Sequence, residues 1–204
     1  MFSQPIIPVI VIKNAQHATA LGQTLVDNGL PIAEVTLRTE SALLSIQAMS
    51  QIEGLQVGAG TVLTVEQARQ AIESGATFLV SPGIHQDVIE YAQSQSIPII
   101  PGITSPSEMA KAIDLGLDTV KFFPAEALGG IKLLKAIASV YPHIKIMPTG
   151  GISPSNVLDY LALDSVIACG GSWMVPEDLV KAQDFDTIAG LIKEAVQLST
   201  PLNN

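Results

Sequence analysis

The sequence predicts an α/β protein with a parallel sheet, and three observations support this fold class. Eight short apolar runs alternate with segments of helical character. The runs are almost continuously apolar, which is typical of strands covered on both faces. The 204 residues leave about 25 for each run, enough for one strand, one helix and two short loops. Eight strictly alternating units indicate a single (β/α)8 TIM-barrel domain that occupies residues 1–204.

The expected strands are spaced regularly along the chain. They cover residues 6–12, 33–38, 55–62, 78–83, 97–103, 119–124, 145–151 and 165–172. An open doubly wound sheet is the alternative arrangement of the same units, but such sheets often carry a G-x-G-x-x-G motif after the first strand. No such motif opens a helix there, so the closed barrel is favoured.

Helix start and end signals lie between these runs. Thr64 with Gln67, and Ser105 with Glu108, have the spacing of capping boxes, and Ser153 precedes a proline that suits a first helical turn. Helices are also expected to end at glycines just before strands, namely Gly29, Gly75 and Gly116. The tail, residues 199–204, is expected to fray.

The composition restricts the class of protein. Only 14% of the residues are charged and 48% are apolar, which excludes an intrinsically disordered chain. A single cysteine excludes a disulfide scaffold and, with an N-terminus that lacks a cationic signal region, predicts a reducing cytoplasm. Ten basic residues in a net charge of −9 make nucleic acid an unexpected partner. No apolar run approaches the roughly 20 residues of a membrane span.

Four charged residues fall within the expected strands, where a charge is costly unless it is paired or used. Lys145 opens its strand and is expected to face solvent at the rim. Side chains alternate along a strand, so Glu34 and Arg38 share one face, and Lys121 shares a face with Phe123. If the apolar residues pack against the helices, these side chains point into the barrel near its C-terminal mouth, where barrel enzymes carry their chemistry.

Two interpretations of these inward charges remain open. In the first, Glu34 bridges Arg38 and Lys121 in a buried ion-pair network, although such networks are often no more stabilising than apolar residues. In the second, a lysine among apolar groups and beside a second cation is disposed to lose its proton, and a neutral amine is a nucleophile towards ketones. Glu34 would then transfer protons.

Glycine-rich segments end the seventh and eighth expected strands. Gly150 and Gly151 end the seventh, and Gly170, Gly171 and Ser172 end the eighth. Loops at these positions form the common phosphate site of such barrels, because glycine lets backbone N–H groups approach phosphate oxygens closely. Two ordinary tight turns are the alternative.

No metal site or cofactor is expected from the remaining candidates. His17, His85 and His143 lack ligand spacing to one another or to Cys169. Cys169 is expected to be a small buried hydrophobe, and Trp173 is expected in the core or at an interface.

Six segments of the chain together resemble one enzyme family. They are residues 34–40 (EVTLRTE), 57–63 (VGAGTVL), 81–83 (SPG), 121–126 (KFFPAE), 148–154 (PTGGISP) and 170–173 (GGSW). With these segments in register, the chain is similar from about residue 6 to 198 to the bifunctional 2-keto-3-deoxy-6-phosphogluconate (KDPG) / 4-hydroxy-2-oxoglutarate (KHG) aldolases. Relatives specific for phosphogalactonate lack the FFPAE and PTGG segments, so the gluconate branch is favoured.

The resemblance implies a class I aldolase, a lyase that uses a Schiff base without metal or cofactor, assembled as a homotrimer. It implies that Lys121 forms the Schiff base and that Glu34 is the general acid/base. Implied substrate contacts are Arg38, Thr61, Pro82, Phe123 and Thr149, and the implied phosphate site is Gly150, Gly151, Gly170, Gly171 and Ser172. The expected reactions, of Entner–Doudoroff type, cleave KDPG to pyruvate and D-glyceraldehyde 3-phosphate, and KHG to pyruvate and glyoxylate.

Two other functions share part of this pattern. A phosphate-binding barrel isomerase or transferase would carry the glycine loops but would not need a lysine within the sixth strand. A phosphosugar-binding protein without turnover would keep the barrel and its pocket. A borohydride trap separates the first function from an aldolase, and pyruvate release separates the second.

Overall fold

All eight expected strands form in the computed structural model, which describes residues 2 and 4–199. They are β1 (Ile6–Ile10), β2 (Ile32–Thr36), β3 (Gln56–Gly60), β4 (Phe78–Ser81), β5 (Ile99–Ile103), β6 (Thr119–Phe122), β7 (Lys145–Pro148) and β8 (Cys169–Gly171). Neighbours pair in parallel in the order β7-β6-β5-β4-β3-β2-β1-β8. Two isolated parallel bridges, Ile146 to Val166 and Thr149 to Gly170, join the two ends of this order. The strands therefore close into the predicted barrel.

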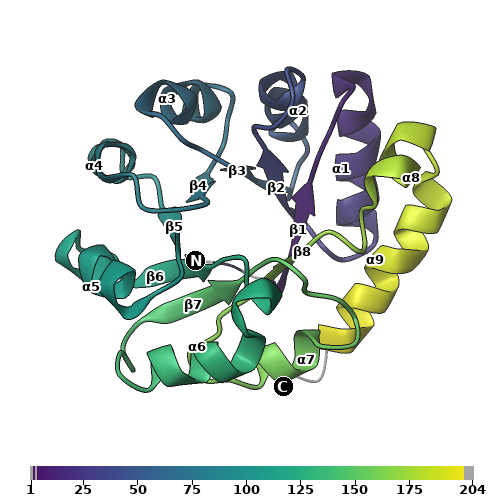
Figure 1. Cartoon of the computed structure of the whole chain (residues 1–204). Helices are drawn as coiled ribbons and strands as arrows, with labels where there is room; N and C mark the ends of the chain where they lie inside the picture. Colours follow the sequence, from purple (N-terminus) through teal and green to yellow (C-terminus); the bar gives the residue numbers. More distant parts are fainter. Residues whose placement is uncertain (1, 3, 200–204) are drawn as a thin grey trace.

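Helices surround the strands on the outside of the barrel (Figure 1). They are α1 (Ala18–Asp27), α2 (Ala42–Met49), α3 (Val65–Glu73), α4 (Gln86–Ser94), α5 (Pro106–Asp114), α6 (Gly130–Ala138), α7 (Val157–Leu161), α8 (Glu177–Ala182) and α9 (Phe185–Ser199), with 3-10 turns η1 (Ala15–His17) and η2 (Glu126–Leu128). Helices cover both sides of an open doubly wound sheet, so this outer ring excludes that alternative.

The capping signals fix the starts of two helices. The hydroxyl of Thr64 accepts a hydrogen bond from the N–H of Gln67 at 3.1 Å, at the start of α3. The Ser105 hydroxyl does the same for the N–H of Glu108 at the start of α5. The expected start at Ser153 is wrong. Residues 153–156 form a turn in which the Asn156 side chain accepts the Ser153 N–H at 2.9 Å, and α7 begins at Val157.

The expected glycine stops also form. The backbone φ angles of Gly29, Gly75 and Gly116 are 82°, 98° and 75°, in the left-handed region that favours glycine. These residues turn the chain from a helix towards the following strand, as the sequence predicts.

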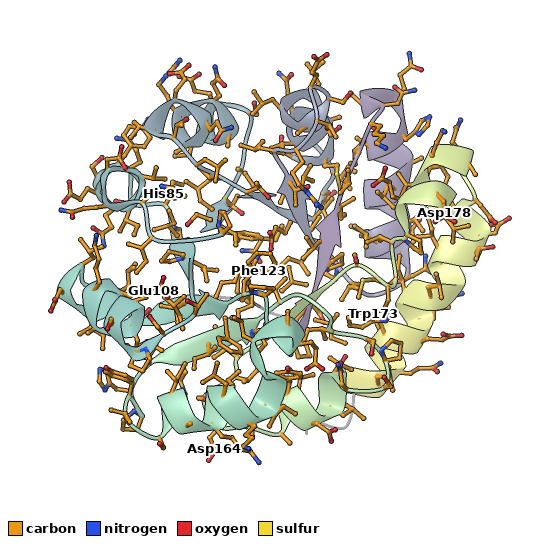
Figure 2. The ribbon with its side chains drawn as sticks, in the orientation of Figure 1. His85, Glu108, Phe123, Asp164, Trp173 and Asp178 are labelled. Atoms are coloured by element: carbon orange, nitrogen blue, oxygen red, sulfur yellow. The ribbon has the colours of Figure 1, made fainter. Side chains whose placement is uncertain are left out.

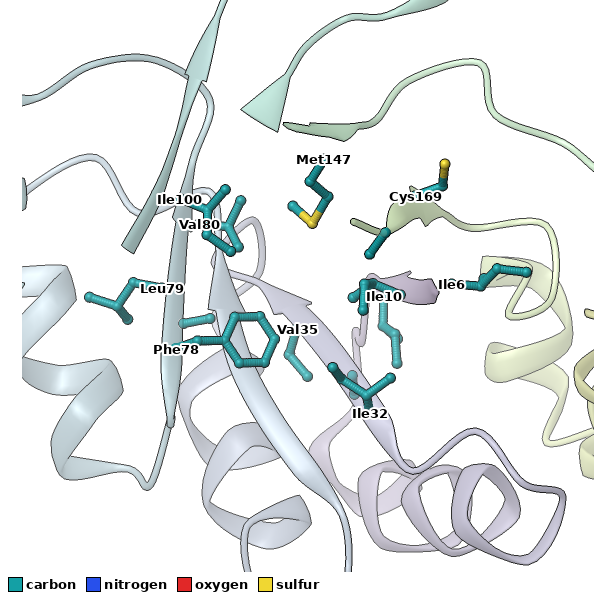
Figure 3. Close-up of a cluster of buried hydrophobic side chains, with 14 of the residues drawn as sticks. Ile6, Ile10, Ile32, Val35, Phe78, Leu79, Val80, Ile100, Met147 and Cys169 are labelled. Carbon is teal, nitrogen blue, oxygen red and sulfur yellow. The ribbon is translucent and has the colours of Figure 1, made fainter. Parts of the chain in front are cut away.

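Apolar side chains of the strands form the core. Figure 3 shows this cluster, which includes Val35 of β2, Phe78 of β4 and Met147 of β7, all fully buried. The Phe78 ring occupies the space over Gly58, where a Cβ atom would lie 2.2 Å from the ring. Burial of one such ring stabilises the fold by about 1.5–3 kcal/mol. The core also contains helix residues such as Leu21, Ile46 and Ile188, so it extends from the strands to the surrounding helices.

The chain ends differ in part from expectation. Ser199, expected to belong to a frayed tail, is the last residue of α9 and is buried. The remaining residues of that expected tail, 200–204, lie outside the described residues. Among the helices of the described chain, none has the length and apolar character needed to cross a membrane.

Candidate active site

A cavity of about 200 Å³ opens at the C-terminal ends of the strands. Its lining residues come from β1, β2 and β6 and from the segments that follow β2, β3, β4, β6 and β7. They are Val9, Glu34, Thr36, Arg38, Thr61, Pro82, Lys121, Phe123 and Thr149. All seven side chains that were expected to be catalytic or to contact the substrate away from its phosphate are therefore brought together.

Lys121 and Glu34 form an ion pair inside this cavity. Lys121 Nζ lies 3.4 Å from Glu34 Oε1, although the two residues are 87 positions apart in the chain. Lys121 is 6% exposed and Glu34 is fully buried. Lys121 Nζ also lies 5.2 Å from the centre of the Phe123 ring, a distance at which an ammonium is attracted to the ring face. The cation is thus held by one carboxylate and one aromatic wall.

Gly60 provides the space for the Glu34 carboxylate. A Cβ atom on Gly60 would lie 2.3 Å from Glu34 Oε1 and 2.8 Å from Glu34 Cγ. Glu34 is paired with Gly58 across the β2–β3 ladder, so its side chain leans over the end of β3. Any larger residue at position 60 would displace the carboxylate from its position beside Lys121.

Two oxygens at the cavity have no hydrogen-bond partner among the described residues. They are Glu34 Oε2 and Thr149 Oγ1, and both are buried. Gly170 makes room for the threonine hydroxyl, because a Cβ there would lie 2.4 Å from Thr149 Oγ1. Buried polar atoms are nearly always hydrogen-bonded in native proteins, so these oxygens mark positions where a ligand or water would be bound.

Arg38 does not join the ion pair. It lies two residues beyond the end of β2 rather than within a strand, and it is exposed. Its Nε donates to the Thr36 hydroxyl at 3.1 Å, and that hydroxyl donates to the Ile10 carbonyl at 2.9 Å. The alternative of a buried network in which Glu34 bridges Arg38 and Lys121 is therefore wrong in its Arg38 half. The Arg38 side chain instead lines the mouth of the cavity and is supported by Thr36.

Thr61 enters the cavity through an unusual backbone conformation. Its φ angle is +58°, in the left-handed region that non-glycine residues rarely occupy. The neighbouring main chain is fixed, since the Val62 N–H donates to the Val80 carbonyl at 3.1 Å. Such conformations cost of order 1–3 kcal/mol and cluster at functional sites.

The glycine segments lie beside this cavity rather than in its wall. Gly150 and Gly151 have φ angles of 97° and 81°, and the bridge between Thr149 and Gly170 brings the two segments side by side. Ser172 lines a second cavity of about 180 Å³, which shares Val9 and Arg38 with the first. The two cavities adjoin at Arg38, so a ligand longer than pyruvate could extend from one towards the other.

The remaining candidates lie away from the cavity. In Figure 2 Phe123 lies near the middle of the ring of strands, whereas His85 lies towards the outside. Cys169 is fully buried, as expected of a small buried hydrophobe, and this burial raises its pKa to about 12. The half-buried Trp173 packs over Gly171. Within the described part of the chain, no three His, Cys, Asp or Glu side chains gather where they could hold a metal ion.

Sequence reasoning missed two residues that shape the cavity. Val9 lines both cavities, and Gly60 accommodates Glu34. Strand alternation correctly places Thr36 on the inward face with Glu34, although its support of Arg38 was not foreseen. No local signal marks Gly60, because the atom it makes room for belongs to another strand.

Comparison with known proteins identifies the relatives of this chain. Residues 1–191 match the family described as "Aldolase: KDPG and KHG aldolase". The KHG/KDPG aldolase of Escherichia coli K12 is 47% identical over 194 residues, which are 95% of this chain and 91% of that protein.

Solved structures show the same similarity. The KDPG aldolase of Legionella pneumophila, with pyruvate captured at low pH as a covalent carbinolamine intermediate, has a TM-score of 0.91 and 40% identity over 95% of this chain and 94% of its own. The KDPG aldolase of Zymomonas mobilis ZM4 with 3-phosphoglycerate has a TM-score of 0.88 and 42% identity, covering 94% and 90%. The chain, with its buried lysine and glutamate at the mouth of a closed barrel, therefore belongs to the KDPG and KHG aldolase family.

Proposed function

We propose that this aldolase cleaves KDPG to pyruvate and D-glyceraldehyde 3-phosphate through a Schiff base on Lys121. The observation that carries the proposal is the buried Lys121–Glu34 pair at 3.4 Å in a cavity of about 200 Å³. The covalent carbinolamine of pyruvate in the Legionella relative supports it, because a carbinolamine is what an amine and a ketone form.

The mouth suits the carboxylate end of a 2-keto acid. Arg38 can bind a carboxylate through two N–H groups, and this would orient C2 towards Lys121. Thr61 offers a hydroxyl beside it, while Pro82 and Phe123 supply apolar walls. Fixing the ketone next to the amine removes much of the entropic barrier to attack.

The chemical steps follow from the lysine and the carboxylate. Proton transfer from Lys121 to Glu34 gives a neutral amine, which attacks C2 and forms a carbinolamine. Glu34 returns a proton as the C2 hydroxyl leaves as water, and the product is a cationic iminium. Glu34, directly or through water, then takes the C4 hydroxyl proton.

Bond cleavage uses the iminium as an electron sink. The C3–C4 bond breaks, its electron pair forms an enamine of pyruvate, and C4 leaves as the aldehyde carbon of glyceraldehyde 3-phosphate. Protonation of the enamine at C3 restores the iminium, and water at C2 then releases pyruvate and the free amine. Thr149, whose hydroxyl is unpartnered, is the residue that we assign to the substrate chain beyond C3.

The phosphate end of the substrate is assigned to the two glycine segments. We propose that Gly150, Gly151, Gly170, Gly171 and Ser172 bind it through N–H groups and one hydroxyl. The positive φ angles of the first two glycines and the adjacency of the segments support this assignment. KHG carries no phosphate, so its cleavage, supported by the name of the Escherichia coli relative, would depend less on these segments.

Borohydride reduction with pyruvate tests the covalent step. Reduction of the iminium should leave a stable adduct that peptide mass spectrometry locates on Lys121. The exposed Lys145, which opens β7 at the opposite end of the barrel, should stay unmodified and serves as the internal control. An adduct on another lysine, or no adduct, would reject the assignment of the Schiff base to Lys121. Pyruvate release from KDPG then distinguishes an enzyme from a binding protein.

We also propose that the protein is a cytoplasmic homotrimer. The family resemblance supports the trimer, and the single buried thiol is compatible with a reducing compartment. Sedimentation equilibrium should give three times the chain mass of 21.4 kDa, and a mass of one chain at micromolar concentration would reject the trimer.

A further inference from the structure

Glu126 and Tyr160 form a pair that lies outside both cavities but contacts the proposed phosphate site. Glu126 begins η2, just after β6, and Tyr160 lies on α7. The Tyr160 hydroxyl donates a hydrogen bond to Glu126 Oε1. Tyr160 is fully buried, and a buried hydroxyl without an acceptor is costly. The carboxylate therefore holds the tyrosine, and the tyrosine fixes the direction of the carboxylate.

Glu126 contacts the segment after β7 with both main chain and side chain. Its N–H donates to the Gly150 carbonyl at 3.0 Å. A Cβ atom on Gly151 would lie 2.6 Å from Glu126 Cβ and 2.7 Å from Cγ, so Gly151 packs directly on the glutamate stem. From the other side, Asn156 Nδ2 donates to the Gly151 carbonyl at 3.0 Å. The turn at Gly150 and Gly151 is thus shaped against Glu126.

Tyr160 extends the contact towards β8. Burial, the hydrogen bond to Glu126 and the nearby Cys169 together raise the pKa of Tyr160, so the hydroxyl stays a donor at neutral pH. Cys169 directly precedes Gly170, the first residue of the second glycine segment. Gly130 leaves room for the pair, since a Cβ there would lie 2.9 Å from Glu126 Oε1 and 3.1 Å from the Tyr160 oxygen.

We infer that Glu126 and Tyr160 are positioning residues for the phosphate group of the substrate. They set the shape of the Gly150–Gly151 turn and hold it in register with the segment that ends β8. The inference rests on the proposed function, in which these two segments bind phosphate. Neither side chain reaches the Lys121 cavity, so the pair acts on phosphate binding and not on bond cleavage.

Tyr160→Phe tests this role because it removes the hydrogen bond and keeps the ring. Tyr141→Phe is the matched control, since the Tyr141 hydroxyl donates to the Pro106 carbonyl at 3.1 Å on the exposed surface. Loss of one hydrogen bond predicts a rise in KM for KDPG of about fivefold for Tyr160→Phe. Its kcat, and its KM for KHG, should stay within about twofold of wild type. Glu126→Gln keeps the acceptor oxygen and should retain near wild-type KM.

Two kinetic results would overturn the inference. One is a lower melting temperature of Tyr160→Phe with unchanged KM values for KDPG and for KHG. That result is expected if the hydrogen bond only stabilises the fold. The other is an equal rise in KM for KDPG and KHG, because only one of these substrates carries phosphate.

Inorganic phosphate separates this inference from the proposed function. Phosphate should raise the melting temperature of the wild type and of Tyr141→Phe, and should raise that of Tyr160→Phe less. If wild type fails to cleave KDPG but this pattern holds, the proposed function is rejected and the inference stands. If wild type cleaves KDPG and Tyr160→Phe behaves like Tyr141→Phe, the inference is rejected and the function stands. If phosphate does not stabilise wild type, the phosphate site and the inference are both rejected.

Discussion

The position of the Glu34 carboxylate depends on Gly60, a neighbour that has no side chain. In Gly60→Ala the new methyl group would lie 2.3 Å from Glu34 Oε1, so the carboxylate must leave its position beside Lys121. A displacement of about 1 Å at a reacting group can reduce turnover by up to roughly 100-fold. Steady-state pyruvate release should therefore fall strongly. Gly190→Ala, at a position with open space around it, is the control and should have wild-type activity. Full activity of Gly60→Ala would contradict this account.

The carboxylate itself should affect turnover more than binding. Glu34→Gln keeps the shape of the side chain but cannot transfer protons, so kcat should fall by about 100-fold or more. KM should change by only a few fold, because the amide still fits beside Gly60. Kinetics of the exposed Glu40→Gln provide the comparison. An unchanged kcat for Glu34→Gln would remove Glu34 from the proton transfers.

Sequence alone predicted the inward charges and offered the Glu34–Lys121 pair as one alternative, but it misplaced Arg38. Alternation along a strand indicates that Glu34 and Lys121 face the barrel interior, and both line the cavity. The same rule cannot extend past the end of β2, where the chain leaves the sheet and Arg38 turns to Thr36. Glu126 was visible in the sequence as part of a motif. Its hydrogen bond with Tyr160 could not be predicted from the sequence, because the two residues are 34 positions apart and meet only through the packing of α7.

Helix ends are the elements that the sequence predicts most directly. Thr64, Ser105 and the three glycines act as expected, because capping depends on residues within one turn. The start at Ser153 failed because the Asn156 side chain, three residues later, takes the Ser153 N–H and holds a turn instead. The strands are shorter than their apolar runs, most clearly β8, since an apolar run continues where ladder pairing has stopped.

The start of α5 should show a specific acid sensitivity. Burial works to raise the pKa of Glu108, but hydrogen bonds from Thr104 and Ser105 outweigh it and lower that pKa below 4.5. A lowered carboxylate pKa stabilises the fold above the unfolded value, and this stabilisation is lost as the pH falls through the folded value. Glu108→Gln should therefore lower the melting temperature at pH 7 and reduce its acid dependence below about pH 4.5.

Melting curves from pH 7 to pH 3 check this prediction. The exposed Glu194→Gln on α9 is the control and should follow wild type at every pH. If Glu108→Gln lost as much stability on acidification as wild type, the hydrogen bonds at Thr104 and Ser105 would not be responsible.

The reaction rate of the single thiol, Cys169, should report on the opening of the barrel. Cys169 is fully buried and burial raises its pKa to about 12, so at neutral pH it is both inaccessible and protonated. A disulfide reagent such as Ellman's should react slowly with the native protein and rapidly in denaturant. Fast reaction with a protein that retains its native circular dichroism would contradict the burial of β8.

The closure of the ring has a consequence for where the barrel opens. Continuous ladders join all the other pairs of neighbouring strands. Only β7 and β8, among the described strands, meet through two isolated bridges instead. The amide hydrogens along this seam should therefore exchange with solvent ahead of those in β2 and β3. The two glycine segments lie on opposite sides of the same seam, so a phosphate bound by both would link the ends of β7 and β8. Substrate would then slow exchange there, and the molecule would be most securely closed while it is occupied.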